Sequence, residues 1–212
     1  MKEDVIILGK GGHAKTIIDM IEEQGIYNIV GVTDYEVSEA EFAGYPVLGT
    51  DDVLPGYFKK GVKNAVIGVG GFRNNDLRIK LFNRAKKVGF NLPVIVHHSA
   101  IVSKTSKIGE GTVIKRGAIV DTDVTIGKNN VLELGSTVGH ESKVGDHVLI
   151  SANSIVSAYD IIEDDVFLAV SSTIISGLKV CSGTLIGAGS VVVKDIEQPG
   201  TYFGLPAKLI TK

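Results

Sequence analysis

The sequence contains no tryptophan and a single cysteine, Cys181, so it can form no internal disulfide and cannot supply a thiolate cluster to a metal. No run of eighteen apolar residues occurs, and we expect a globular protein without a membrane-spanning helix. Basic residues are not in excess, because the formal net charge is -2, so nucleic acid binding is not expected. The short apolar run that follows residues 1–4 is unlike a secretion signal, which makes the cytoplasm the expected location.

Glycine, in contrast, is abundant, with 26 residues among 212, and the second half of the chain repeats with a period of six. From Val96 to Val192 in steps of six, all seventeen positions are Val, Ile or Leu, with no insertion. A run of this kind has a chance probability on the order of 10^-7. The repeat is therefore a real feature of the fold.

Six residues are enough for one short strand and one corner, so three units close a triangular coil of eighteen residues. The aliphatic residue is expected to point inward, and stacked coils would then bury a continuous column of Val, Ile and Leu. A glycine often follows the aliphatic residue and is expected to accommodate a tight or left-handed corner. These glycines are Gly109, Gly127, Gly139, Gly145 and Gly187. The repeat predicts a parallel β-helix of between five and six coils.

Residues 1–95 follow a different pattern, in which strands and helices alternate. Residues 5–8, 29–33 and 64–69 predict strands, and residues 93–96 lead into the repeat. Helices are predicted over residues 14–24 and from about Arg73 to Val88. Such alternation indicates a small parallel sheet of Rossmann type, with ligands expected beyond the carboxyl ends of the strands.

A glycine turn, Gly9-Lys10-Gly11-Gly12-His13, connects the first predicted strand to the first helix. Bare amides at a helix N-terminus bind diphosphate well, because glycine allows close approach and the helix dipole favours anions. The spacing is not the full dinucleotide fingerprint, so packing alone is the alternative interpretation. Asp34, at the end of the second predicted strand, is either an acceptor for a ribose hydroxyl or a solvated loop carboxylate.

Of the five histidines, His140 is the best candidate for chemistry. It lies two residues after the inward-pointing Val138, and Glu141 follows it directly. An imidazole beside a carboxylate is a plausible general base, because histidine titrates near neutral pH. Successive strand residues point to opposite faces, so His140 and Glu141 can cooperate only if the corner bends them together.

The alternative use of the histidines is a zinc site, since carbonic anhydrases with a hexapeptide β-helix bind zinc through three histidines. Zinc needs three protein ligands at about 2.1 Å. His140 and His147 have no third histidine later in the repeat, so no metal site is predicted. His97 and His98 are expected to be junction residues.

Taken together, the chain resembles the sialic-acid O-acetyltransferase and UDP-amino-sugar N-acetyltransferase family over essentially all its residues. The resemblance is carried by the glycine turn, the seventeen hexapeptides, the His140-Glu141 pair and two C-terminal runs, residues 186–195 and 202–208. It implies a Rossmann-like nucleotide-sugar-binding domain over residues 1–95, a left-handed parallel β-helix acetyltransferase domain over 96–197, and a C-terminal cap over 198–212.

The resemblance also implies an acetyl-CoA-dependent homotrimer whose active sites lie between neighbouring β-helices. His140 would be the catalytic base and Glu141 its assistant. The substrate-binding residues would be Gly9, Gly11, Gly12, His13, Asp34 and Glu133. The residues that bind the acetyl-CoA co-substrate would be Ala158, Gly187 and Ala188 along the pantetheine, with Pro206 and Lys208 near the CoA nucleotide.

Two positions depart from the family pattern. Glu133 stands where UDP-amino-sugar acetyltransferases carry Asn, and Leu149 stands where they carry a second His. Both positions lie close to His140 in the aligned register, so the identity of the acceptor sugar is left open. We predict an acetyl-CoA-dependent N-acetyltransferase for a UDP-4-amino sugar in surface glycan biosynthesis. The alternatives are a sialic-acid type O-acetyltransferase, a non-catalytic trimeric binding module and a metal-dependent hydration enzyme.

Overall fold

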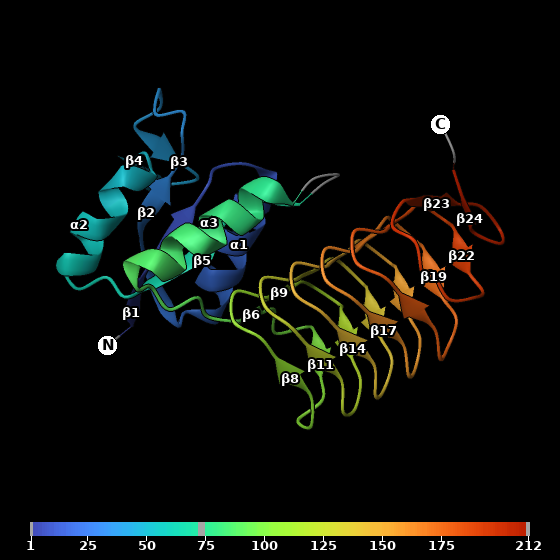
Figure 1. Ribbon diagram of the computed structural model, residues 1–212. Helices are drawn as coiled ribbons and strands as arrows, with labels where there is room; N and C mark the ends of the chain where they lie inside the picture. The colour runs from blue at the N-terminus through green and yellow to red at the C-terminus, as the bar shows by residue number, and fades with distance from the viewer. Residues whose placement is uncertain (1, 72–74, 211–212) are drawn as a thin grey trace. The chain divides into compact units, whose positions relative to one another are not determined.

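The computed structural model describes residues 2–71 and 75–210, and the chain forms two compact units, Met1–Ile95 and Val96–Lys212 (Figure 1). Within the described part of the chain, no helix is both long and apolar enough to cross a membrane. The elements of the first unit are β1 (Glu3–Leu8), α1 (Gly12–Gln24), β2 (Tyr27–Thr33), β3 (Glu41–Phe42), β4 (Tyr45–Gly49), the 3-10 helix η1 (Asp51–Val53), α2 (Leu54–Lys59), β5 (Asn64–Ile67) and α3 (Asp76–Val88).

The first unit is built on a five-stranded sheet with the strand order β3-β4-β2-β1-β5. Strand β1 lies between β2 and β5 and pairs in parallel with both, as the alternating pattern predicts. Its residues Ile6 and Leu8 are fully buried and belong to one cluster with Leu81 and Phe82 of α3. This apolar cluster holds the carboxyl ends of β1 and β2 in place beside the glycine turn.

The sheet is mixed rather than purely parallel, because the edge strand β3 runs antiparallel to β4. Neither strand is predicted above, nor is α2, since residues 41–59 are short elements broken by glycine and proline with no clear period. Strand β5 ends at Ile67 instead of Val69, and α3 begins at Asp76. The predicted helix start at Arg73 lies outside the described residues.

From β6 to β22 the second unit consists of two-residue strands, each paired in parallel with a strand eighteen residues away, as Thr137 is with Ile155. The tail strands β23 and β24 differ, because they pair antiparallel with each other and β23 joins β21 in parallel. The strands form three sheets, which are the three faces of a triangular coil. The first face contains β7 (Ile101–Val102), β10 (Ile119–Val120), β13 (Thr137–Val138), β16 (Ile155–Val156), β19 (Thr173–Ile174) and β22 (Val191–Val192). The second face contains β8 (Lys107–Ile108), β11 (Thr125–Ile126), β14 (Lys143–Val144), β17 (Ile161–Ile162) and β20 (Lys179–Val180). The third face contains β6 (Ile95–Val96), β9 (Val113–Ile114), β12 (Val131–Leu132), β15 (Leu149–Ile150), β18 (Phe167–Leu168), β21 (Leu185–Ile186), β23 (Thr201–Phe203) and β24 (Lys208–Leu209).

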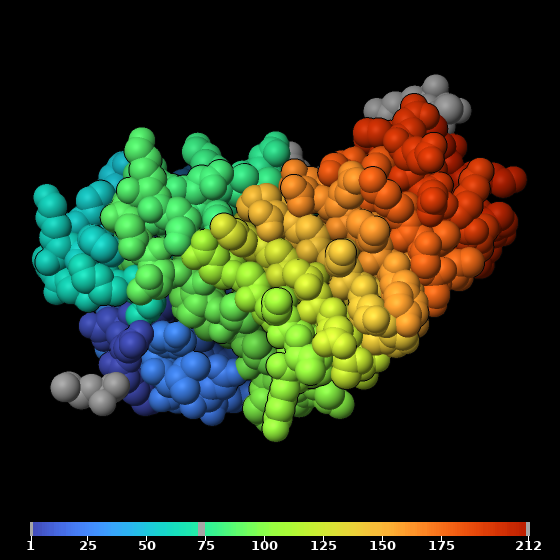
Figure 2. Space-filling model, turned by 60° about the horizontal axis from the view of Figure 1, so that its bottom comes forward, coloured from blue at the N-terminus to red at the C-terminus, as the bar shows by residue number. Residues whose placement is uncertain are grey.

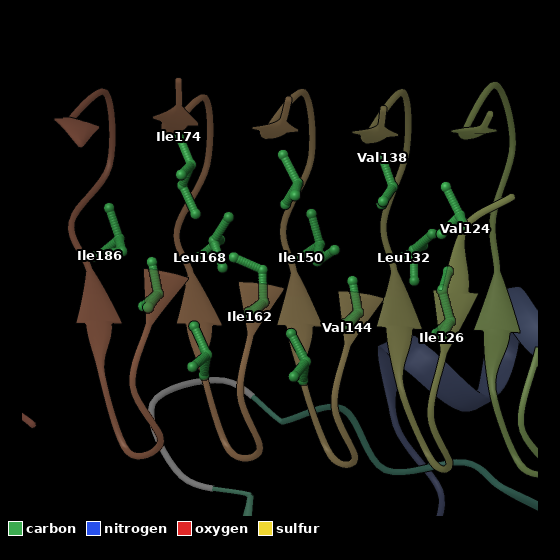
Figure 3. Close-up of a cluster of buried hydrophobic side chains, with 14 of the residues drawn as sticks. Val124, Ile126, Leu132, Val138, Val144, Ile150, Ile162, Leu168, Ile174 and Ile186 are labelled. Atoms are coloured by element: carbon green, nitrogen blue, oxygen red, sulfur yellow. The ribbon is translucent and has the colours of Figure 1, made fainter. Parts of the chain in front are cut away.

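The coils stack in chain order, as the green-to-red progression along this unit in Figure 2 shows. From Ile114 to Val192 every aliphatic residue of the six-residue period is buried in a single cluster, and Val96, Val102 and Ile108 pack against it. Figure 3 shows these side chains converging on the interior of the coil. The predicted inward column is confirmed. Each coil adds three such side chains, and full burial of one contributes about 1.5–3 kcal/mol to the free energy of folding.

The expectation for the corner glycines was wrong. The left-handed residue is the third after the aliphatic residue, and all fourteen such positions from Gly111 to Gly189 have positive φ. Glycines directly after the aliphatic residue instead allow close stacking of coils. A Cβ at Gly109 would lie 2.4 Å from the carbonyl oxygen of Gly127, and one at Gly187 would lie 2.1 Å from Phe203. The left-handed positions that are not glycine are Asp123, Asn129, Glu141, His147, Asn153, Tyr159, Asp165 and Ser171.

The residue four after the aliphatic one is often a buried polar residue that bonds to the next coil. In five cases its side chain donates to the carbonyl fifteen residues further on. These are Ser106 to Asp121 at 2.5 Å, Thr112 to Gly127 at 3.0 Å, Asn130 to Gly145 at 2.9 Å, Ser142 to Ser157 at 2.7 Å and Ser154 to Ala169 at 2.7 Å. These bonds satisfy polar groups inside the corners.

Candidate active site

In the first unit, the glycine turn lies where β1 ends and α1 begins, as the sequence predicts. Position 9 requires glycine, because its φ is +99° and a Cβ there would lie 2.3 Å from Val69. At Gly11 and Gly12 a Cβ would meet nothing within 4 Å, so no packing constraint requires glycine there. His13 lies in the first turn of α1 and is half-buried. The open amides before α1 are those that an anionic ligand can approach.

Asp34 follows β2 and lies against the same turn. One carboxylate oxygen accepts a hydrogen bond from the Lys10 backbone N–H at 2.7 Å, and the other accepts one from the Glu36 N–H at 3.0 Å. The structure thus brings Asp34 and the turn together. Each oxygen of a carboxylate has a second lone pair, so Asp34 fixes the turn and can still accept a bond from a hydroxyl group.

In the second unit, His140 and Glu141 lie at the corner between β13 and β14. Glu141 has the left-handed φ of 59°, and this bend turns its side chain back toward the imidazole. The His140 Nδ1 atom lies 3.2 Å from Glu141 Oε2. The condition for cooperation is therefore met. With the proton on Nδ1, the ring donates to the carboxylate, and Nε2, which has no hydrogen-bond partner among the described residues, carries the lone pair of a base.

Tyr159 completes this cluster, and sequence reasoning missed it. It is stacked eighteen residues after Glu141, and its ring meets the His140 ring edge-to-face, with centroids 5.0 Å apart and an interplanar angle of 83°. Hydrogen bonding from the Tyr159 hydroxyl, and then from His140, lowers the pKa of the Glu141 carboxyl. The same bond raises the pKa of Tyr159. The eighteen-residue coil is the sequence signal that would have found it.

The two positions that depart from the family pattern have different surroundings. Glu133, on the third face, forms an ion pair with Lys115 one coil earlier, with Nζ to Oε1 at 2.7 Å. The Lys115 side chain is 7% exposed, so this pair is largely shielded from solvent. Leu149 is buried on the same face. His147 lies at another corner, where its Nδ1 is 2.9 Å from Asn129 Nδ2.

The residues expected to bind CoA lie in the late coils and the tail. Ala158 is half-buried directly before Tyr159, while Ala188, Pro206 and Lys208 are exposed. Gly187 is buried, and the ring of Phe203 covers it. The tail extends the third face through β23 and β24, so these residues are fixed by strand pairing with β21.

Comparison with known proteins agrees with this arrangement. A family model described as the PglD N-terminal domain matches residues 4–85. UDP-N-acetylbacillosamine N-acetyltransferase of Bacillus subtilis is 32% identical over 123 residues, 53% of this chain, and the match spans about half of that relative, 51%. Among solved structures, a histidine variant of perosamine N-acetyltransferase from Caulobacter crescentus, in complex with CoA and GDP-perosamine, is 30% identical. The similarity covers 99% of this chain and 97% of that one, with a TM-score of 0.92. The acetyltransferase domain of PglB from Neisseria gonorrhoeae FA1090 is 28% identical, with coverage of 99% and 100% and a TM-score of 0.91.

A hexapeptide β-helix with an outward histidine–carboxylate pair, joined to a Rossmann-like unit with an open glycine turn, defines a class of acyltransferases. The solved relatives confirm that the β-helix is left-handed, as expected. The chain belongs to the PglD-like family of sugar N-acetyltransferases.

Proposed function

We propose that this protein transfers an acetyl group from acetyl-CoA to the amine of a nucleotide-linked 4-amino sugar, with His140 as the general base and Glu141 as its assistant. The expected substrate is a UDP sugar. A cytoplasmic location and a role in surface glycan synthesis are part of the same proposal. The observation that carries it is the His140–Glu141 pair, which presents Nε2 outward on a chain that matches a sugar N-acetyltransferase over nearly its whole length.

The pair accounts for the chemistry of acetyl transfer. A sugar amine attacks only when it is neutral, and Nε2 takes its proton as the nitrogen bonds to the thioester carbonyl carbon. The tetrahedral intermediate then collapses, the carbon–sulfur bond breaks, and CoA leaves with a proton. Glu141 holds the Nδ1 proton and stabilises the imidazolium that forms. A base placed in this way contributes about 10^2 to 10^4-fold to the rate.

The first unit supplies the nucleotide site in this proposal. Gly11 and Gly12 leave the backbone amides before α1 open to a diphosphate, and Asp34 offers acceptor capacity for a hydroxyl group beside them. The matched relative from Caulobacter crescentus has GDP-perosamine bound, and the relative from Bacillus subtilis is named for a UDP sugar. Both nucleotides therefore belong in any test of the substrate.

The donor site is proposed along the late coils. Ala158 is half-buried and Ala188 exposed, and as small residues they leave backbone groups accessible to a pantetheine arm, while Gly187 lies beneath the ring of Phe203. Pro206 and Lys208 are exposed on the tail near the expected CoA nucleotide. A lysine there can pair with a CoA phosphate. The acetyltransferase domain of PglB has been solved in complex with acetyl coenzyme A, which supports the choice of donor.

A homotrimer is proposed because the outside of the first face of the β-helix carries exposed isoleucines, with Thr137 between two of them. Ile101, Ile119 and Ile155 lie in register on this face and are 65%, 38% and 40% exposed. Such a stripe is a candidate interface. Strand β13 of the same face leads directly into the corner that holds His140, so packing this face against a second copy would set the imidazole in a groove between subunits.

The test is mass spectrometry of reactions with acetyl-CoA and a panel of UDP-amino, GDP-amino and free sialic acid acceptors. We expect a gain of about 42 Da on one nucleotide-linked amino sugar and a kcat at least about 100-fold lower for His140→Ala. His147→Ala is the matched histidine control and is expected to keep its activity. Near-normal turnover of His140→Ala would refute the assigned base, and a gain only on sialic acid would favour O-acetylation.

A further inference from the structure

Beyond the pair that carries the proposed function, Tyr159 makes three contacts with the same corner. Its ring lies edge-to-face on His140 with centroids 5.0 Å apart. Its hydroxyl interacts with the Glu141 carboxylate, which lowers the pKa of Glu141 and raises that of Tyr159. Its backbone N–H donates to the His140 carbonyl at 3.0 Å. One residue thus touches both members of the pair from the next coil.

The backbone at this position indicates that an aromatic residue is not the easiest choice. Tyr159 has a φ of 62°, in the left-handed region where a residue with a Cβ costs about 1–2 kcal/mol relative to the usual conformation. One coil further on, the equivalent position is Gly177, which adopts the same region without that cost. Seven other corners of the β-helix have a non-glycine residue in this conformation, so the backbone alone assigns no role to Tyr159 and its side-chain contacts must account for it.

Exposure gives a second argument. The Tyr159 residue is 57% exposed, so burial of its ring in the core does not explain it. Its hydroxyl interacts with the carboxylate of Glu141, whose side chain is 47% exposed and whose other described side-chain contact is with His140. An exposed ion pair contributes little stabilisation by itself. A carboxylate as exposed as that of Glu141 therefore needs a second contact to keep one orientation.

We propose that Tyr159 is a positioning residue for the reaction, whose hydroxyl holds the Glu141 carboxylate against His140 Nδ1 while its ring fixes the plane of the imidazole. The inference rests on the proposed function. Tyr159 acts through Glu141 and need not touch either substrate. Loss of the hydroxyl lets the carboxylate turn into solvent, so that the imidazolium formed during proton transfer loses its partner for part of the time.

Other charged groups near this corner are few among the described residues. By the stacking relation, Asp121 and Asp123 lie one coil earlier, and the buried Asp160 follows Tyr159 directly. None of the hydrogen bonds described for Asp121 and Asp160 goes to His140 or Glu141. Glu141 is therefore the carboxylate described in contact with the His140 ring.

The experiment compares Tyr159→Phe with wild type and with the control Tyr57→Phe, which removes a tyrosine hydroxyl from α2. We expect kcat to fall about five- to tenfold for Tyr159→Phe, with the KM of both substrates within about twofold. The acidic limb of the kcat/KM profile should move to lower pH by several tenths of a unit, because the protonated imidazole is less stabilised. Tyr57→Phe should match wild type in both respects.

Two further measurements identify the route of the effect. In a Glu141→Ala background, adding Tyr159→Phe should change kcat by less than about twofold, because the group through which Tyr159 acts is gone. The NMR titration midpoint of the His140 ring should move in the same direction as the pH profile. The inference is refuted if Tyr159→Phe leaves kcat and the midpoint unchanged, or if its loss is as large without Glu141.

These outcomes are separate from failure of the proposed function. If wild type acetylates an amino sugar and Tyr159→Phe equals it, only the positioning role is lost. If wild type acetylates no sugar, the proposed function fails, and the NMR titration of His140 in wild type and Tyr159→Phe still tests the contact. Tyr159→Leu, which removes the ring as well, should lower kcat further than Tyr159→Phe; equal losses would remove the ring from the proposal.

Discussion

Replacing the buried acid Asp160 tests directly whether polar side chains inside the β-helix corners need hydrogen bonds to the next coil. Asp160 is 0% exposed and occupies the same place in its six-residue unit as Asn130 and Ser142. Oδ1 accepts the Leu178 N–H at 2.8 Å, and Oδ2 has no hydrogen-bond partner among the described residues. The equivalent Asn130 accepts the Val148 N–H through Oδ1 and donates through Nδ2 to a carbonyl. Asp160 therefore lacks the donor that its position calls for.

The missing donor sets a dependence of stability on pH. Burial raises the pKa of Asp160 from 3.8 to about 6, against the lowering effect of backbone N–H groups. A folded-state pKa above the unfolded value means that the neutral acid favours folding and the charged form opposes it. The cost is small below pH 4, grows as the pH rises through 6, and reaches at most about 3 kcal/mol above it, at 1.36 kcal/mol per pKa unit.

Asp160→Asn should remove this cost, since the amide cannot ionise and can donate to the carbonyl fifteen residues on, that of Ile175. We expect the free energy of unfolding of the variant, relative to wild type, to increase by about 2 kcal/mol between pH 4.5 and pH 8. The assay is urea unfolding followed by circular dichroism at several pH values and one protein concentration.

Asn130→Asp is the reciprocal control, because it places a carboxylate in the equivalent corner. It should lose stability at pH 8 and recover part of it at pH 4.5. A constant difference between Asp160→Asn and wild type across this range, or a less stable Asp160→Asn at pH 8, would refute the reasoning about the buried acid.

Three further predictions concern other parts of the chain. Gly109→Ala should destabilise by about 3 kcal/mol, because its Cβ would meet the backbone of the next coil, whereas Gly189→Ala, with open space and a φ of +66°, should cost only about 1 kcal/mol; equal losses in denaturant unfolding would contradict the two roles. Ile150→Ala should cost about 2–5 kcal/mol in the same assay, since Ile150 is fully buried between coils. Asp34→Ala should raise the KM for the nucleotide sugar about tenfold and leave the KM for acetyl-CoA unchanged, because it releases the glycine turn; an equal rise for both substrates would argue against a nucleotide site there.

Much of the fold could be predicted from the sequence, because burial in a β-helix repeats with the six-residue period of the aliphatic residues. Val138, Ile150 and Ile162 are inward for the same reason, so one register predicted the whole column. The glycine turn and Asp34 were predictable as well, since parallel strands end at one edge of a sheet. The hairpin of β3 and β4 was not, because its strands are too short to show a period and their pairing is a tertiary contact.

The candidate site was also predictable only in part, because some of its contacts depend on tertiary structure. His140 beside Glu141 is a sequence pattern, but their contact depends on a left-handed corner at Glu141, and the residue type there does not demand one. Tyr159 is far from them in sequence and joins them only because the coils stack. The predicted glycine corners failed for a related reason: the close approach at Gly109 comes from the neighbouring coil.

The sequence alone determined which side chains are inward, because a strict six-residue period leaves the chain one way to bury its Val, Ile and Leu residues. It also determined the glycine turn before the first helix. The tertiary structure decided what meets across coils, namely Tyr159 on His140, Lys115 on Glu133 and a buried Asp160 without a donor. The first two contacts join residues about eighteen positions apart, and their distances depend on how one coil sits on the next.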